Sequence, residues 1–260
     1  MNEFVTQQGT PLVSVVMPAY NAAEYIEAAV TSVQRQSFTN WELIVVDDCS
    51  SDETCPFVER LARQDPRIRL YHNAQNQGTA YSRNHGLEQC RGDYVALLDS
   101  DDIWHPEKLE KQLALIQKEG ADLVYTSYAI VDEHGQKRCN DFLVPSQTDF
   151  SALLKENVIG CSTVLMTHKV TEQFHFDNTY YHEDYVLWLQ MLRSGKRAVG
   201  VTDVLVDYRY HSGSRASNKL SSAKRRWTIY RSYLGLSRMK SIRYLMHYGI
   251  SGLRKYKNIQ

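Results

Sequence analysis

The 260-residue sequence lacks several features that mark common classes of protein. It has no stretch near the ~20 consecutive apolar residues of a membrane-spanning helix, so any membrane contact is expected to be peripheral. Residues 1–11 are polar and contain no apolar signal segment. Its five cysteines include no Cys-x-x-Cys pair, which disfavours a zinc site or a disulfide framework and favours reduced thiols in the cytoplasm. No Gly-x-Gly-x-x-Gly follows the first apolar run, so a dinucleotide-dependent dehydrogenase is disfavoured.

Acidic residues are missing from the end of the chain. Residues 208–260 carry 13 Lys and Arg and no Asp or Glu, although the whole chain has a formal net charge of zero. Such asymmetry predicts an anionic partner for this basic tail, either a nucleic acid or a membrane surface. The sequence contains no nucleic-acid recognition motif and the remainder of the chain is acidic, so we expect no nucleic-acid partner.

From residue 222 onward the basic tail has a helical pattern in which Lys and Arg flank apolar and aromatic residues. This composition suits the interface of an anionic membrane. The alternative is that the apolar face packs on the rest of the protein while the charges are solvated. We expect a combination, with packing near Trp227 and peripheral contact with the inner face of the cytoplasmic membrane further along the tail.

Short apolar runs alternate with helical patterns in the first half of the chain. The runs predict strands at residues 12–17, 43–46, 68–71, 94–98 and 123–128. Ser50 and Glu53 have the spacing of a capping box at the start of the second helix. Further on, the patterns predict helices at 150–156 and 183–193 and strands at 163–166 and 204–208, the last near a sheet edge.

This order of elements predicts an α/β fold with a mostly parallel sheet flanked by helices. Ligands of such sheets bind beyond the carboxyl ends of the strands. We therefore expect the polar segments after the first, second and fourth strands to converge on one crevice.

Three carboxylates, Asp99, Asp101 and Asp102, lie within four residues directly after the fourth apolar run. Carboxylates this close repel one another and usually need a cation or strong hydrogen-bond donors. Oxygen ligands select hard ions such as Mg²⁺ and Mn²⁺. The alternative is a solvated loop before Pro106, with Asp102 as a helix cap or a salt-bridge partner, and the pattern alone leaves both interpretations open.

Four segments resemble, in order and spacing, the family 2 glycosyltransferases: residues 13–21 (VSVVMPAYN), 43–52 (LIVVDDCSSD), 76–84 (NQGTAYSRN) and 92–102 (GDYVALLDSDD). The pair Glu183-Asp184 resembles the downstream acidic motif of that family, and the resemblance covers roughly residues 11–215. It implies a GT-A fold and metal-dependent, inverting transfer of one sugar from a nucleotide diphosphate sugar, as in bacterial surface-polysaccharide enzymes.

The resemblance also implies an organisation of the chain. We expect a GT-A catalytic domain at 1–215, with a nucleotide-sugar-binding half at 1–130 and an acceptor-binding half that carries the base at 131–215. The basic amphipathic helical tail would occupy 216–260. UDP-sugar is the expected donor, and a lipid-linked glycan is the expected acceptor.

At matching positions the resemblance implies that Asp184 is the general base. Asp101 would ligate a Mn²⁺ or Mg²⁺ ion directly, and Asp99 would hold the metal or the ribose. His211 is a further candidate metal ligand. Arg215 is a candidate phosphate clamp, although the segment around both residues also fits a surface loop.

On the donor side, Asp48 would accept the imide hydrogen of uracil with help from Asp47, although both residues also suit the capping of the second helix. Arg83 would contact the diphosphate or order the carboxylates; its alternatives are a surface charge or a partner of Asp99. Glu183 would orient Asp184 or favour a helix N-terminus. The remaining candidate substrate-binding residues are Pro18, Tyr20, Asn21 and Ser100.

Two competing functions use the same residues. A non-catalytic nucleotide-sugar-binding module would keep Asp48 and Asp101 but lack a base, and Asp184 argues against it. A nucleotidyltransferase that makes nucleotide sugars usually opens with a glycine-rich, basic phosphate loop. The first loop here, Pro-Ala-Tyr-Asn at 18–21, is neither glycine-rich nor basic.

Overall fold

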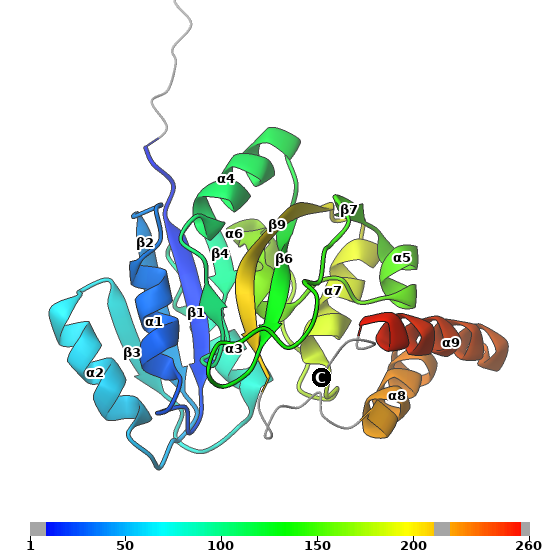
Figure 1. Ribbon diagram of the computed structural model, residues 1–260, viewed down its shortest axis with the longest axis horizontal. Coiled ribbons are helices and arrows are strands. Elements are labelled where there is room, and N and C mark those ends of the chain that lie inside the picture. The colour runs from blue at the N-terminus through cyan, green and yellow to red at the C-terminus, as the bar shows by residue number, and fades with distance from the viewer. Residues whose placement is uncertain (1–8, 211–218, 256–260) are drawn as a thin grey trace, which may run out of the picture.

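The computed structural model describes residues 9–210 and 219–255 (Figure 1). Within these residues a nine-stranded sheet runs in the order β3-β2-β1-β4-β8-β6-β9-β5, and β7 pairs with β9. The strands are β1 (Val13–Ala19), β2 (Trp41–Asp47), β3 (Ile68–His72), β4 (Tyr94–Leu97), β5 (Ile103–Trp104), β6 (Leu123–Val131), β7 (Gln147–Thr148), β8 (Leu165–Thr167) and β9 (Ala198–Arg209).

Helices connect and cover these strands. They are α1 (Ile26–Gln34), α2 (Thr54–Gln64), α3 (Thr79–Glu88), α4 (Lys108–Glu119), α5 (Phe150–Lys155), α6 (His168–Thr171), α7 (Glu183–Arg193), α8 (Lys219–Thr228) and α9 (Arg238–Lys255). A 3-10 turn lies at Cys161–Thr163, and a π-helical turn at Ile229–Tyr233 follows α8.

The sheet is parallel over most of its strands. β1 pairs in parallel with β2 and β4, β2 with β3, and β6 with β9. The short strand β8 lies antiparallel between β4 and β6. The predicted α/β fold with a mostly parallel, helix-flanked sheet is confirmed.

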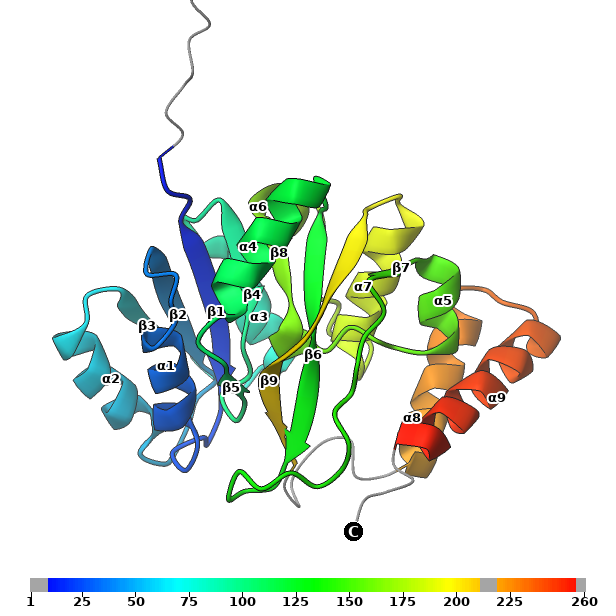
Figure 2. The same ribbon diagram turned by 45° about the horizontal axis from the view of Figure 1, so that its top comes forward.

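Side chains that alternate along the central strands fill two hydrophobic clusters, one on each face of the sheet. In β1, Val15 and Met17 belong to one cluster and Val16 to the other. Helices α1, α2 and α4 pack in the first cluster, on the near side of the sheet in Figure 2. Helices α3, α5 and α7 pack in the second. Burial on both faces explains why these strands are mostly apolar and do not alternate between apolar and polar residues.

The predicted capping box of the second helix is wrong. Helix α2 begins at Thr54, and Glu53, which precedes it, makes no side-chain capping hydrogen bond. Ser50 instead accepts a hydrogen bond from the backbone N–H of Asn21 through its hydroxyl, at 2.9 Å. Its side chain therefore joins the loop after β1 to the loop after β2 and is not available to a helix start.

The predicted strand at 204–208 is the second half of the longer strand β9, which begins at Ala198. Two polar residues, Thr202 and Asp203, interrupt the apolar pattern between the halves. There the pairing with β6 shifts, because Thr126 lies opposite Val201 and the next residue lies opposite Val204. A β-bulge of this kind breaks the alternation that sequence patterns detect.

The tail packs at the end of the molecule opposite α2, beside α5 (Figures 1 and 2). Ile229 and Tyr230 are buried in the second hydrophobic cluster. The Tyr230 hydroxyl donates a hydrogen bond to the carbonyl oxygen of Leu154 at 2.7 Å. None of the described helices is both long enough and apolar enough to cross a membrane. Ile229 and Tyr230, which follow Trp227, thus provide the packing that was predicted near Trp227. The domain boundary at 215 stays a prediction.

Helix α3 approaches β1 so closely that a Cβ at Gly86 would lie 2.5 Å from Val16 Cγ1 and 3.3 Å from Val46 Cγ2. We expect Gly86→Ala to lower the free energy of unfolding by about 1–3 kcal/mol, measured by urea denaturation. Gly249→Ala is the control, since an added Cβ in α9 meets nothing within 4 Å. It should raise stability by about 0.5–1 kcal/mol through helix propensity. Equal effects of both changes would contradict the close packing of α3.

Candidate active site

Residues that follow β1, β2 and β4 line one cavity of about 350 Å³, here named the strand-end cavity. Thr79 and Ser82 of α3 and Tyr208 of β9 complete its wall. The expected convergence of the three polar segments is confirmed. Of the candidate site residues, the cavity is lined by Pro18, Tyr20, Asn21, Asp48, Asp99, Ser100 and Asp101.

Asn21 holds the loop after β1 against the loop after β2. Its backbone has a φ of 46°, a left-handed conformation that Asn tolerates better than most residues. Its side-chain oxygen accepts a hydrogen bond from the backbone N–H of Ser51 at 2.9 Å. Tyr20, beside it, is 51% exposed. The turn therefore presents a large aromatic ring at the cavity on a fixed backbone.

Asp48 is buried and holds the N-terminus of α3. Its carboxylate accepts hydrogen bonds from the backbone N–H groups of Gln77 at 2.9 Å and Gly78 at 2.7 Å, and from the Asn73 amide at 2.8 Å. A carboxylate has about four acceptor positions, so three donors leave room for one more. Neither Asp48 nor Asp47 caps α2, because that helix begins only at Thr54.

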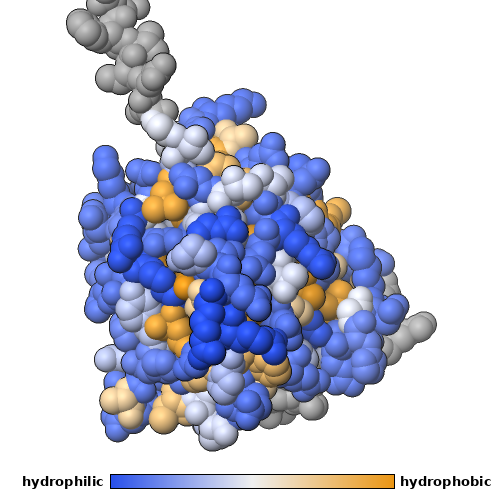
Figure 3. Space-filling view, turned by 90° about the vertical axis from the view of Figure 1, so that its left-hand side faces the viewer, coloured by the Kyte–Doolittle hydropathy of each residue, from blue (hydrophilic) through white to orange (hydrophobic). Residues whose placement is uncertain are grey.

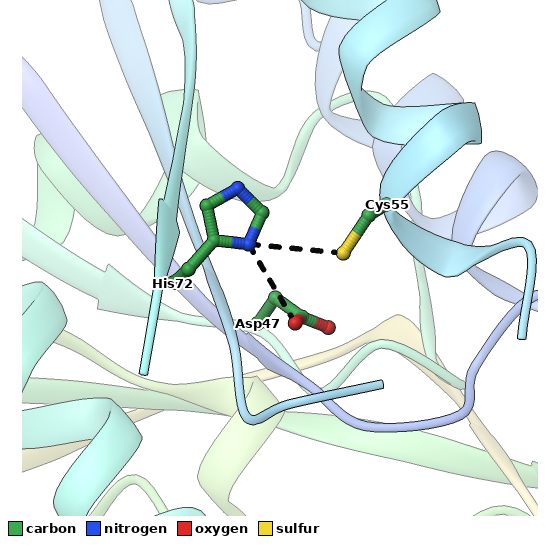
Figure 4. A group of neighbouring side chains, drawn as sticks. All are labelled: Asp47, Cys55 and His72. Carbon is green, nitrogen blue, oxygen red and sulfur yellow. Dashed lines mark hydrogen bonds and ion pairs between the residues drawn. The ribbon is translucent and has the colours of Figure 1, made fainter. Parts of the chain in front are cut away.

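Asp47 lines neither of the cavities described here and belongs to a separate cluster with Cys55 and His72 (Figure 4). His72 Nδ1 lies 3.8 Å from the Cys55 sulfur and 3.7 Å from a carboxylate oxygen of Asp47. Burial and the neighbouring Asp47 raise the pKa of the Cys55 thiol to about 12. The thiol is therefore protonated at neutral pH. That Asp47 helps Asp48 to bind uracil stays a prediction.

Arg83 bridges two carboxylates from distant parts of the chain. Its guanidinium donates to Asp99 at 2.6 Å and to Glu183 at 2.8 Å, and its side chain is 1% exposed. Burial acts to lower the pKa of Arg83, but the nearby carboxylates, led by that of Asp99, hold it well above its usual value. The surface-charge alternative is wrong, since Arg83 is a buried partner of Asp99.

Ser162 organises the acidic loop after β4, a role the sequence did not signal. Its hydroxyl accepts from the backbone N–H of Asp99 at 3.0 Å and donates to Asp102. Asp102 also accepts from the backbone N–H of Arg209 at 3.0 Å. Burial, and then the charges of Asp101 and Asp99, raise the pKa of Asp102 well above its usual range. Asp102 is therefore an internal brace between the acidic loop and β9, and not a cap of α4, which begins at Lys108.

A second cavity of about 250 Å³, here named the tyrosine-rich cavity, lies next to the first. Asp99 and Tyr208 line both cavities, so the two adjoin there. Asp184 lines the second cavity from the first turn of α7 and accepts a hydrogen bond from the backbone N–H of Tyr185 at 2.7 Å. The other charged and tyrosine side chains that line it include Arg83, Glu156, Glu183, Arg226, Tyr128, Tyr181, Tyr185, Tyr210 and Tyr248.

The structure thus brings most of the candidate residues to two adjoining cavities. Asp101 and Asp48 face the first cavity, Asp184 faces the second, and Asp99 faces both. His211 and Arg215 lie outside the described residues. Sequence reasoning did not single out Arg226 or the tyrosines of the second cavity, because residues from several distant elements form that wall.

The model of the family named Glycosyl transferase family 2 matches residues 14–165. The chain is 37% identical over 245 residues to the putative teichuronic acid biosynthesis glycosyltransferase TuaG of Bacillus subtilis, covering 94% of this chain and 97% of the relative. It is 36% identical over 252 residues to WfgD of Escherichia coli, covering 95% and 97%. That relative is named a UDP-Glc:alpha-D-GlcNAc-diphosphoundecaprenol beta-1,3-glucosyltransferase.

Solved structures share the fold at lower identity. The chain superimposes on S. aureus TarS in complex with UDP-GlcNAc with a TM-score of 0.73 and 21% identity, covering 90% of this chain and 70% of that one. For the mannosyltransferase PcManGT of Pyrobaculum calidifontis, in complex with GDP-Man and Mn²⁺, the TM-score is 0.68 and the identity 17%, with the same coverage. The fold is that of GT-A glycosyltransferases. The family model and the curated relatives together show that this chain belongs to glycosyl transferase family 2 and is a glycosyltransferase.

Proposed function

We propose that the protein transfers a single sugar, with inversion, from a UDP-sugar to a hydroxyl group of a lipid-linked glycan. The observation that carries this proposal is the pair of adjoining cavities that meet at Asp99. One cavity has the carboxylates suited to a metal-bound diphosphate, and the other has a carboxylate suited to deprotonate an acceptor. A sugar held where the cavities meet would lie between leaving group and base.

The donor would occupy the strand-end cavity. Its carboxylate oxygens, from Asp99 and Asp101, are the ligand type that Mn²⁺ and Mg²⁺ prefer. When bound, such an ion would supply charge stabilisation for the leaving diphosphate. Asp48, with one acceptor position left, would receive the imide hydrogen of uracil. The UDP-GlcNAc complex of TarS and the Mn²⁺ complex of PcManGT support this assignment.

Asp184 would be the general base. It lies in the first turn of α7. The residue before it, Glu183, forms an ion pair with Arg83 at 2.8 Å. The ion pair fixes the start of the helix, so Asp184 stays at the wall of the tyrosine-rich cavity. There it would take the proton of the acceptor hydroxyl as that oxygen attacks the anomeric carbon. A single displacement needs one base and inverts the anomeric centre.

The acceptor would be a glycan attached to a lipid carrier at the inner face of the cytoplasmic membrane. The name of the E. coli relative specifies a sugar on diphosphoundecaprenol, and that of the B. subtilis relative specifies teichuronic acid biosynthesis. The diphosphoundecaprenol in the name of the E. coli relative is the basis for the lipid-linked acceptor proposed here.

The outer face of α9 suits contact with that membrane. Met239, Ile242, Met246 and Ile250 are all exposed, and their spacing places them on one side of the helix. The exposed basic residues Arg238, Lys240 and Arg243 flank this stripe. By contrast, the side of the molecule that carries α2 is mostly hydrophilic, with only scattered apolar residues (Figure 3). An apolar stripe flanked by basic residues is the pattern of a helix that lies in a membrane interface.

We expect Asp184→Asn to lower kcat for sugar transfer by about 10²–10⁴-fold, the usual contribution of a general base, while binding of UDP with Mn²⁺ stays within about twofold. Asp101→Ala should instead abolish metal-dependent UDP binding. Calorimetry and a nucleotide-release assay over a panel of nucleotide sugars measure both effects. Glu59→Gln, a half-exposed carboxylate on α2, is the control for loss of charge.

Two outcomes would contradict this assignment. Turnover of Asp184→Asn near that of the unchanged protein would remove Asp184 from the role of base. Tight UDP-sugar binding without consumption, with every donor and acceptor supplied, would favour a binding module over a transferase.

We expect the protein to float with vesicles that contain anionic lipid and to stay in solution with zwitterionic vesicles. Met239→Ser should reduce the bound fraction at least several-fold, because burying a methionine side chain contributes about 1.5–3 kcal/mol. Leu143→Ser is the matched control, since Leu143 is also strongly exposed but lies far from α9 in the sequence. Equal losses in both variants, or no lipid preference, would contradict docking through α9.

A further inference from the structure

Arg226 is a buried cation at the wall of the tyrosine-rich cavity. It lies on α8 and is 5% exposed. Its guanidinium carbon is 3.8 Å from the ring centroid of Tyr185 and 4.4 Å from that of Tyr248. The guanidinium is thus in contact with an aromatic ring of α7 and with one of α9.

The charge of Arg226 has no carboxylate partner within residues 9–210 and 219–255. Arg83, the other arginine of the cavity, is neutralised by Asp99 and Glu183. The Nη1 atom of Arg226 is buried and makes no hydrogen bond to any described residue. An arginine is always protonated in proteins, and a buried charge without a counter-ion is costly even when aromatic rings contact it. An anion bound at this wall would supply the missing counter-charge.

Arg226 lies on the part of the cavity wall that α9 helps to form, and α9 also carries the exposed apolar stripe. Tyr248, which stacks on Arg226, follows Met239 by nine residues. At about 100° per residue these two side chains lie on opposite sides of the helix. One side of α9 thus contributes to the cavity wall, while the other carries the exposed apolar stripe. A group that joins a sugar in the cavity to a lipid in the membrane would pass near Arg226.

We propose that Arg226 binds the diphosphate of a lipid-linked acceptor, and so recognises the acceptor by the group that joins sugar to lipid. The proposal rests on the proposed function, since it requires that the acceptor occupy the tyrosine-rich cavity. The guanidinium offers a fork of N–H donors that matches phosphate oxygens, and contact with two aromatic rings restricts the positions that the fork can take. The tyrosine rings of the same cavity supply faces and hydroxyls for the sugar.

The probe for this site is farnesyl diphosphate, with farnesol as its uncharged counterpart. Calorimetric titration in the presence of EDTA prevents a metal ion from holding the probe in the strand-end cavity. We expect farnesyl diphosphate to bind at least tenfold more tightly than farnesol. Arg226→Met should remove this difference, and Arg226→Lys should retain part of it, because an ammonium keeps the charge but not the fork.

Three controls separate recognition from folding. Lys224→Met, an exposed position of the same helix, should bind farnesyl diphosphate as the unchanged protein does. Binding of UDP with Mn²⁺ should be equal in all variants, because Arg226 does not line the strand-end cavity. Thermal unfolding reports whether Arg226→Met stays folded. If it does not, the affinities of Arg226→Lys and Lys224→Met for farnesyl diphosphate are compared, and weaker binding by Arg226→Lys alone supports the proposal.

The proposal is overturned if farnesyl diphosphate does not bind, if it binds no better than farnesol, or if a folded Arg226 variant binds it unchanged. Competition by glucuronate as strong as that by inorganic diphosphate would overturn the assignment to phosphate and indicate an acidic sugar. The assay needs no turnover, so its outcome is separable from the proposed function. Absence of donor consumption would contradict the proposed function while leaving the binding result in place.

Discussion

The buried ion bridge of Arg83 is the interaction on which the arrangement of the active site depends. It links α3 to the acidic loop after β4, 16 residues along the chain, and to the start of α7, 100 residues away. Removing one partner of such a bridge leaves a buried charge unpaired and costs about 3–5 kcal/mol. The bridge sets the position of Asp99, where the two cavities meet, relative to α7. The walls of the two adjoining cavities are thus held together by one buried ion bridge.

The first half of the fold was predictable from the sequence because strands that are buried on both faces appear as short, mostly apolar segments. β1, β2 and β4 are mostly apolar, and polar residues that follow each of them line one cavity. Two-residue strands such as β5 and β7 are too short to show any period. The capping box failed because Ser50 makes a tertiary hydrogen bond to the backbone of Asn21. Local spacing does not reveal that competition.

The lining of the candidate site was predictable where residue types repeat a family pattern and unpredictable where residues far apart in the sequence come into contact. Arg83 and Glu183 are 100 residues apart, so no spacing shows that they touch. Within the basic tail, the sequence does not distinguish Arg226 from its basic neighbours Lys224 and Arg225. A weak signal does exist, because Arg226 precedes the buried residues Ile229 and Tyr230 by three and four positions and so shares their helix face. Its stacking on tyrosines from two other helices needed the structure.

The claim that Arg83 and Glu183 act as one unit is tested most directly by a double-mutant cycle of Arg83→Met and Glu183→Gln. Both the free energy of unfolding and kcat for sugar transfer should be measured at each corner of the cycle. If the bridge couples the two halves of the site, the second substitution will cost little once the first is present, with a coupling of about 1–3 kcal/mol. Effects that add to within about 0.5 kcal/mol would show that the two residues act independently and would contradict the account.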